Sequence, residues 1–388
     1  MRLHLILPEV VPTALSVPSR CPGPDCSSAR FRRHQAVNKR VRDTVYHEVT
    51  VQRYQCLRCG RTFRVYPQGV TPAQSSQRVR GLAVMLYLLG LSYGAVSLAL
   101  RALGVPLCKS RVYDLVQAAA ERVPGLQQEQ VFNDLRTPAL GGDVTSVKCR
   151  GRWLPLGLTV DDIHGLVLTV DALAGEDAAV LTAWLAPIAA AVGARLLVTD
   201  DADAFKVVAE DLGLDQQVCK SHVKRNTEAL IETLTATLQQ GPDVSLAAIG
   251  LTAEQAVADL EQLGELIASR CPEDITILER LHDRYARAAA PRPGERATVA
   301  YRLRLLFLDR WSLWPQLTRY RHWRGPHGET VDGTNNSSER GIGWWIKERY
   351  RTMRGYKRVR SAVNVSRLLA WAGNHLNTGG ADLAPLLA

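Results

Sequence analysis

The hydrophobic pattern changes sharply beyond Pro138, and this change constrains the fold more than any other feature. Three candidate strands with alternating apolar residues follow, at residues 142–149, 152–160 and 165–173. Short turns rich in glycine and aspartate separate them, which favours an antiparallel meander. An Ala-rich helix is then expected over about 176–192, followed by an apolar strand over 195–199 that ends at Asp200. This order predicts a layered α/β structure.

The second half of the chain switches to a helical pattern. A helix and a short strand complete the sheet region, at residues 204–212 and 217–219. Residues 223–325 show almost continuous helical periodicity, with a Pro-rich break at 291–294. A run of Gly, Asn and Ser over 332–338 is expected to cap a helix that begins near Glu339. No strand pattern returns beyond this point.

The arrangement of the eight cysteines favours a metal site over disulfides. Four of them form two pairs in the strand-rich first 70 residues, Cys21-x4-Cys26 and Cys56-x2-Cys59. Two thiolates two residues apart can share one ion, and Gly60 permits the tight turn that follows them. Because four thiolates would close the coordination shell, we expect a structural Zn²⁺ ion. Unrelated buried or surface thiols are the alternative.

Three short helices are expected between residues 78 and 123. The first is closed by Gly90, the second follows Ser92 and runs to Gly104, and the third starts after Ser110. Helices joined by such short turns are typical of a helix-turn-helix, although a spacer that never touches DNA would give the same pattern. Three side chains near the start of the third helix are candidates for contact with base edges: Lys109, Arg111 and Tyr113.

Positive charge is concentrated near the two ends of the chain. The net charge is +10, with twelve Lys and Arg against four Asp and Glu in residues 1–70, and nine against one in residues 340–367. Such clusters suggest a polyanionic partner that contacts several surfaces of the protein. Ordinary solvated surface is the alternative. The candidate DNA-contacting residues in these clusters are Arg30, Arg32, Arg33, Lys39, Arg40, Arg42, Arg340, Trp344, Lys347, Arg351 and Arg354.

Three acids have settings that suit metal binding. Asp143 lies within the first strand, Asp200 ends an apolar strand, and Glu339 lies in the first turn of its helix. A carboxylate at the end of a buried strand is poorly solvated unless it finds a cation. Acids on two adjacent strands and one helix can converge on two Mg²⁺ ions about 3.5–4 Å apart. Asp201 is the alternative to Asp200, and three nearby acids are expected to serve as turn and cap residues: Asp161, Asp162 and Asp203.

Three strings carry a resemblance to a known family: Gly-Gly-Asp143-Val-Thr, Leu-Leu-Val-Thr-Asp200-Asp201 and Thr334-Asn-Asn-Ser-Ser-Glu339-Arg340. They resemble the three acidic blocks of the DDE transposases of bacterial insertion sequences, in the style of those related to the eukaryotic Mutator-like group. The pair Cys219-x2-His222, the helical insertion and the string at residues 351–356 add to this resemblance. The zinc ribbon followed by a helix-turn-helix is also familiar in such enzymes.

The resemblance covers nearly the whole chain and implies a ribonuclease-H-like catalytic core. It also implies two Mg²⁺ or Mn²⁺ ions per active site. The implied reaction is strand cleavage and strand transfer on double-stranded DNA, namely the terminal inverted repeats and the target DNA. A homodimer or larger multimer would carry it out. The implied domains are a zinc ribbon (1–70), a helix-turn-helix (71–130), a catalytic core (136–225 and 328–378) and a helical insertion (226–327). Cys219 and His222 could bind a metal, contact DNA or fix the junction between core and insertion. Tryptophans that could stack on a displaced base are Trp323, Trp344 and Trp345.

Two other functions fit part of the pattern. A domesticated regulator would bind the repeats without cutting them, yet all three acids are present. A structure-specific nuclease or ribonuclease H would not need two N-terminal DNA-reading modules. The sequence also shows no secretory signal and no stretch of about 18 uncharged apolar residues. We therefore expect a cytoplasmic protein, associated with the bacterial nucleoid and not with a membrane.

Overall fold

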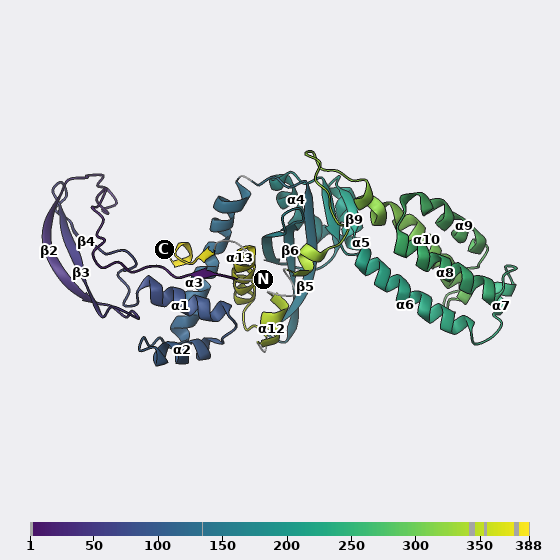
Figure 1. Cartoon of the computed structure of the whole chain (residues 1–388), viewed down its shortest axis with the longest axis horizontal. Coiled ribbons are helices and arrows are strands. Elements are labelled where there is room, and N and C mark those ends of the chain that lie inside the picture. The colour runs from purple at the N-terminus through teal and green to yellow at the C-terminus, as the bar shows by residue number, and fades with distance from the viewer. Residues whose placement is uncertain (1–2, 134, 341–345, 353–354, 376–379, 388) are drawn as a thin grey trace. The chain divides into compact units, whose positions relative to one another are not determined.

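The computed structural model describes residues 3–133, 135–340, 346–352, 355–375 and 380–387. The chain divides into two compact units. The first unit comprises Met1–Asn133, Val147–Leu154 and Gly343–Ala388, and the second comprises Asp134–Ser146 and Pro155–Ile342. Both contain helices and strands, so the fold is mixed α/β (Figure 1). The finer division into four domains stays a prediction.

A three-stranded antiparallel sheet forms the N-terminal part of the first unit (Figure 1). Its strands, in the order β2-β3-β4, are β2 (Phe31–Arg40), β3 (Glu48–Cys56) and β4 (Thr62–Val65). Val49, Val51 and Tyr54 of β3 are buried at alternate or near-alternate positions, as a half-buried strand requires. Strand β2 is mostly exposed on both faces, which is why its sequence shows no apolar period.

Two very short strands near the ends of the chain pair in parallel, β1 (Leu5–Ile6) and β10 (Ala381–Asp382). The prediction that no strand follows Glu339 was therefore wrong. Two residues are too few to show a period, so only the pairing itself reveals β10.

The three predicted helices of the first unit are confirmed as α1 (Gln77–Leu88), α2 (Tyr93–Ala102) and α3 (Lys109–Gln127). The hydroxyls of Ser76 and Ser92 cap α1 and α2 by accepting backbone N–H groups. The start of α3 was predicted too late, because Cys108 occupies the N-cap position and supplies no side-chain hydrogen bond to mark it. A single π-helical turn, η1 (Gln128–Phe132), follows α3.

The remaining helices of the first unit are α12 (Glu348–Thr352), α13 (Val359–Asn374) and the 3₁₀ turn η5 (Pro385–Leu387). Helix α13 packs along α3. Asn364 Nδ2 donates to Gln117 Oε1 (3.1 Å), and Arg360 Nη2 donates to Glu121 Oε1 (2.7 Å). Polar bonds thus fix the register of two helices that otherwise meet through apolar side chains.

A five-stranded mixed sheet organises the second unit, with strand order β7-β6-β5-β8-β9. Its strands are β5 (Ala139–Cys149), β6 (Arg152–Asp161), β7 (Leu166–Ala172), β8 (Leu196–Thr199) and β9 (Asp215–Val218). Strands β6 and β7 are antiparallel, whereas β5, β8 and β9 run parallel. The five predicted strands are confirmed, although β5 begins earlier than expected, at Ala139.

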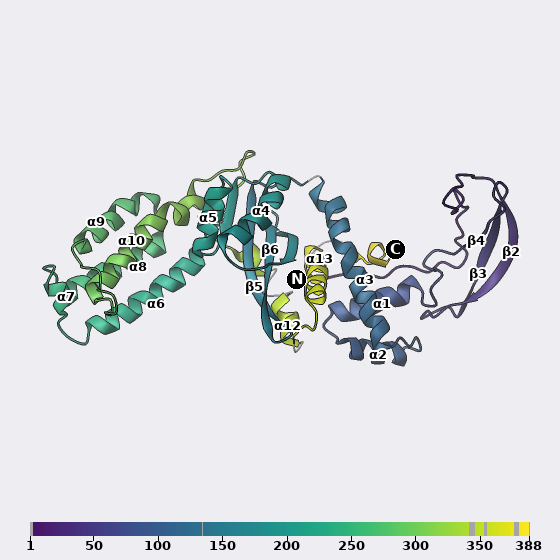
Figure 2. The same cartoon turned by 180° about the vertical axis from the view of Figure 1, so that it is seen from behind.

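Different segments cover the two faces of this sheet (Figures 1 and 2). On one face lie α4 (Ala178–Val192) and α5 (Asp203–Asp211), since a Cβ added to Gly142 would contact Leu185 of α4 and Phe205 of α5. On the other face, the side chains of Ala139, Leu196 and Val198 pack with Trp323 and Val331 in one hydrophobic cluster. This second face carries the candidate site.

A helical region completes the second unit, as predicted, and has a core of its own (Figure 2). Trp314, Phe307 and Tyr285 are the largest fully buried side chains in that core. Its elements are α6 (Lys220–Leu238), α7 (Val244–Ala247), α8 (Ala253–Ser269), η2 (Pro272–Asp274), α9 (Ile275–Tyr285), α10 (Val299–Thr318) and η3 (Arg319–Arg321). Of the helices described, none has the length and apolar character needed to cross a membrane.

Candidate active site and metal centres

The pairing of β5 with β8 aligns two of the three predicted acids. Gly141 lies opposite Val198 in parallel register, so extending the register by two residues sets Asp143 opposite Asp200. Residues two apart on a strand share a face. Asp143 therefore follows Gly141 on the face that Val198 shares, and Asp200 follows Val198 beyond the end of β8. By this extension, Asp143 of β5 and Asp200, the residue after β8, come from neighbouring segments, and we expect their carboxylates on one face of the sheet.

The segment that carries the third acid is pressed onto this same face. A Cβ on Gly141 would lie 2.5 Å from Val160 Cγ2 and 2.8 Å from Ser338 Oγ, distances that real Cβ atoms essentially never show. Only glycine therefore lets α11 (Asn336–Arg340) come this close to β5. Ser338 directly precedes Glu339, so the close approach brings Glu339 toward the strand that holds Asp143.

Backbone hydrogen bonds tie the elements around this face together. The N–H of Cys219 donates to Thr199 O (2.8 Å), which joins the start of α6 to the end of β8. The N–H of Lys220 donates to Gly333 O (2.9 Å), which joins α6 to the loop before α11. Buried backbone groups need such partners. These bonds hold three segments that are far apart in the sequence at one end of the sheet.

The side chain of Glu339 lies nearest to a cysteine and a histidine. Its Oε1 is 3.4 Å from His222 Nδ1, and the potential ligand atoms of Cys219, His222 and Glu339 all lie within 4.8 Å of one another. Among the described residues, the other such group is the four N-terminal cysteines, and Asp143 and Asp200 belong to neither. A site for two metal ions spreads its ligand atoms more widely than a site for one ion, so its acids need not all lie within one such group.

The neighbours Asp200 and Asp201 have different surroundings. Asp201 lies 3.3 Å from Lys206 Nζ and 3.9 Å from Arg310 Nη1, so two cations already face it. Burial nevertheless raises the pKa of Asp201 above its ordinary value, against the opposing effect of Lys206 and Arg310. Asp200 Oδ1 accepts only a local turn bond, from the N–H of Ala202 (3.1 Å), among the contacts described. This contrast favours Asp200 as the metal ligand.

A fourth acid on the candidate face was read from the sequence only as a turn residue. Oδ1 of Asp162 would lie 3.7 Å from a Cβ on Gly141, and it is buried without a hydrogen-bond partner in the described part of the chain. Burial raises its pKa to about 7, with smaller contributions from Asp332 and Asp161, while the Ser337 side chain opposes the shift. Only the packing of Ser337 and Ser338 over the sheet could have revealed this environment.

Asp161 is a turn residue as predicted, whereas Asp203 is not a cap, because Ala202 is the N-cap of α5 and Asp203 is the first residue of the helix. Asp161 Oδ1 accepts from the Thr137 hydroxyl (2.6 Å) and from the N–H of Ile163 (3.0 Å) in the turn after β6. Asp203 opens α5 and accepts from Lys206 Nζ (2.8 Å).

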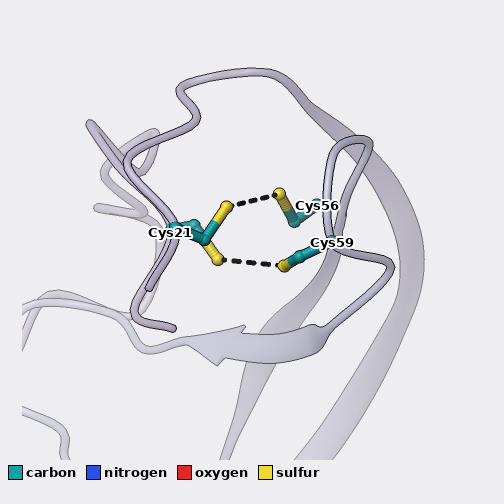
Figure 3. Close-up of side chains that lie close together, drawn as sticks. Cys21, Cys56 and Cys59 are labelled. Carbon is teal, nitrogen blue, oxygen red and sulfur yellow. Dashed lines mark hydrogen bonds between the residues drawn. The ribbon is translucent and has the colours of Figure 1, made fainter. Parts of the chain in front are cut away.

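The four N-terminal cysteines converge as their spacing predicts, and we call them the four-cysteine cluster (Figure 3). Cys21 Sγ lies 3.6 Å from Cys59 Sγ, and Cys26 Sγ lies 3.8 Å from Cys56 Sγ. The N–H of Cys59 lowers the pKa of Cys56 to about 6, despite burial and with help from the N–H of Arg58. Against the opposing effect of the Gly23 N–H, burial and the neighbouring sulfurs instead raise the pKa of Cys21 to about 11. Four converging sulfurs suit Zn²⁺, so the cluster could bind a zinc ion.

The predicted DNA-contacting residues near the N-terminus are mostly exposed along β2. Arg30, Arg33 and Arg40 present their side chains to solvent. Arg32 Nε instead donates to Gln55 Oε1 (2.8 Å). Lys39 Nζ donates to Ala73 O (2.8 Å), and burial lowers its pKa with a further contribution from Arg64. Arg42 is exposed, with Nη1 donating to Pro106 O at 3.3 Å.

The predicted contacts on α3 fall into two kinds. Lys109 and Arg111 are exposed in its first turn. Tyr113 is half-buried, with its hydroxyl 2.8 Å from Ser361 Oγ and its ring 5.4 Å from that of Tyr93. The phenol of Tyr113 therefore already has partners inside the unit, in contrast to the two basic side chains beside it.

The C-terminal basic cluster is only partly described. Lys347 and Arg351 are exposed, and Arg351 pairs with Glu348 one helical turn earlier. The side chain of Arg340 and all of Trp344, Trp345 and Arg354 lie outside the described residues.

One tryptophan that the sequence suggested for base stacking is buried, and so is one arginine of the C-terminal basic cluster. Trp323 is 7% exposed and packs against the sheet, so it is not available to stack on a base. Arg349 is 5% exposed; it donates to Gly90 O (2.5 Å) and lies 4.3 Å from the centre of the Tyr87 ring. Tertiary packing decides both cases, because a local sequence rich in arginine does not distinguish a buried side chain from an exposed one.

No protein-family model and no curated protein matches the chain. Solved structures of the HTLV-2 integrase catalytic core domain in complex with magnesium are similar to parts of it. The dimeric form is 23% identical over 26% of this chain and 72% of that one (TM-score 0.19), and the trimeric form is 20% identical over 33% and 84% (TM-score 0.19). The simian T-cell lymphotropic virus intasome in complex with the PP2A regulatory subunit B56 gamma is 12% identical over 64% and 72% (TM-score 0.20). These TM-scores are too low to decide the fold, so we infer function from the site itself.

Proposed function

We propose that the chain is a metal-dependent DNA transposase with a ribonuclease-H-like catalytic core. In this proposal Asp143, Asp200 and Glu339 hold two Mg²⁺ or Mn²⁺ ions. The observation that supports it is the parallel pairing of β5 with β8, whose extension would align Asp143 with Asp200, together with the close approach of Ser338, which precedes Glu339, to Gly141. Carboxylates from neighbouring strands and a helix can hold two ions about 3.5–4 Å apart, the spacing that two-metal phosphoryl transfer uses.

The donor set offered by Asp143 and Asp200 fits magnesium. Asp143 and Asp200 offer carboxylate oxygens, the ligands that Mg²⁺ prefers, and both are partly exposed, so water can complete an octahedral shell. When bound, the two ions would activate a water or DNA 3′-hydroxyl and stabilise the leaving oxygen. Asp162 adds a buried carboxyl beside the same face and could accept or hold a proton near neutral pH.

The proposed DNA-reading parts lie in the first unit. The four-cysteine cluster would act as a zinc ribbon that stiffens the sheet bearing Arg30, Arg33 and Arg40. Helices α1 to α3 would act as a helix-turn-helix, with Lys109 and Arg111 exposed at the start of α3. Their ligand would be the terminal inverted repeats, bound by a homodimer or larger multimer in the cytoplasm of a bacterial cell.

The test combines purified full chain, Mg²⁺ and labelled DNA that carries the ends of the element. Wild type is expected to bind, nick and join these ends. Asp143→Asn and Glu339→Gln should bind DNA normally but cut at least about 10³-fold more slowly, because each removes a charged metal ligand. Asp203→Asn is the matched control, since Asp203 is an exposed acid at the start of α5.

The outcomes separate the candidate functions. Binding without any cutting or joining would contradict the enzyme and favour a regulator. Cutting without joining would favour a nuclease. Equal cutting by wild type and both variants would contradict the metal-ligand assignment.

A further inference from the structure

A buried thiol and an imidazole lie beside Glu339 at the start of α6. Cys219 is the N-cap residue of α6 and is fully buried, and His222 follows in the first turn. Residues three apart on a helix face the same side, so the Cys-x2-His spacing points both side chains toward α11. The potential ligand atoms of Cys219, His222 and Glu339 lie within 4.8 Å of one another.

The polar atoms of this cluster are incompletely satisfied. Nδ1 of His222 is buried and makes no hydrogen bond within the described part of the chain, although Glu339 Oε1 lies 3.4 Å away. A buried polar atom without a partner costs free energy, and a bound cation would remove that cost. The sulfur of Cys219 is already oriented, because the N–H of Asn335 points at it from 3.3 Å. Such outer hydrogen bonds typically fix metal ligands in place.

The chemistry of the cluster differs from that of the proposed magnesium site. Thiolate and imidazole are ligands that Zn²⁺ and Co²⁺ accept and Mg²⁺ avoids, and a carboxylate is a common third ligand. Three protein ligands leave a fourth position for water. Glu339 is 44% exposed, which gives an ion a route from solvent to the buried sulfur.

We propose that Cys219, His222 and Glu339 form a binding site for a Zn²⁺-class ion, separate from the N-terminal four-cysteine cluster. The binding itself does not depend on the proposed function. One consequence does rest on it: an ion held by Cys219 and His222 would occupy Glu339 and withdraw it from the magnesium site. Zn²⁺ would then inhibit the Mg²⁺-dependent reaction through this cluster.

Zinc binding is measured by titrating the metal-free full chain with Zn²⁺ against a chromophoric chelator. Wild type is expected to bind about two ions per chain, one at the four-cysteine cluster and one here. Cys219→Ser and His222→Ala should each lose one ion, with affinity at this site falling by at least about 100-fold. Cys271→Ser is the matched control, because Cys271 also lies beside a carboxylate, 2.7 Å from Glu273 Oε2, but forms no three-ligand group with a histidine among the described residues.

A second readout guards against misfolding of the variants that alter buried groups. Glu339→Gln changes a half-exposed side chain, so it should keep the fold while weakening the same site. Co²⁺ added to a Cys56→Ser background should give a thiolate-to-cobalt absorption band that disappears with Cys219→Ser. One zinc ion per wild-type chain, or stoichiometry unchanged by Cys219→Ser, His222→Ala and Glu339→Gln alike, would overturn the proposal. Neither readout requires DNA cleavage, so failure of the proposed function would leave this test intact.

Discussion

The four-cysteine cluster of the first unit and the carboxylate face of the second unit are assembled in opposite ways. The cysteines come from two tight turns, and each pair is complete within six residues of sequence. Asp143, Asp200 and Glu339 come from a strand, a strand end and a helix, and the whole helical region separates the last two. Local turns position the sulfurs, whereas strand register and close packing position the oxygens.

The two sites also differ in the cation that they suit. Four sulfur ligands fill the coordination positions of a Zn²⁺ ion, which favours a structural role. Partly exposed carboxylates favour Mg²⁺ and leave room for water and substrate. The cluster of Cys219, His222 and Glu339 combines both ligand types beside the second site. We therefore expect substitutions at the first site to affect stability and DNA binding, and those at the second to affect the reaction.

The largest expected effect distinguishes two neighbouring acids in the second unit. Asp200→Asn should slow DNA cleavage by at least about 10³-fold, because it removes a charged metal ligand. Asp201→Asn should retain cleavage within about tenfold, because Asp201 faces Lys206 and Arg310 instead. Single-turnover cleavage rates in Mg²⁺ measure the difference. The reverse ranking would mean that the register inferred from β5 and β8 does not extend to Asp200.

The next effect concerns the four-cysteine cluster. Cys56→Ser should release about one Zn²⁺ per chain and unfold the small sheet around it, because metal binding and folding are coupled in such modules. DNA binding should fall with it, whereas Asp200→Asn should bind like wild type. Metal analysis and filter binding check this, with Cys271→Ser of the second unit as control. Unchanged DNA affinity in Cys56→Ser would separate the cluster from DNA recognition.

The smallest effect concerns Asp162 and pH. Because burial raises its folded-state pKa from the ordinary value of 3.8 to about 7, the folded state holds a proton more tightly than the unfolded chain. This contribution to stability is fully present below about pH 4 and is lost as pH rises through about 7. Asp162→Asn should therefore flatten the decline in stability between about pH 5 and pH 8, by on the order of 2 kcal/mol.

Thermal unfolding at both pH values, without added divalent cations, measures this change. Asp203→Asn serves as the exposed control. A wild-type stability that is level over this range, or a variant with the same slope, would contradict the buried environment of Asp162.

Helical and strand periods in the sequence predicted much of the fold. Ser92 marked the start of α2, and the apolar run before Asp200 marked β8. Strand β2 was missed because both its faces are largely exposed, and the early start of α3 was missed because Cys108 provides no capping signal. Patterns of this kind report burial and capping, so they fail where an element has neither.

The sequence by itself determined which residues could hold metal: the spacing of the cysteines, and an acid at the end of an apolar strand. Only the tertiary structure decided which side chains meet. It buried Asp162 beside Gly141, turned Trp323 and Arg349 inward, and set Glu339 beside Cys219 and His222. The physical reason is the distance along the chain between the residues that interact. Turns and caps depend on residues a few positions apart, whereas the candidate site depends on parallel strand register and on one glycine that leaves room for a distant helix.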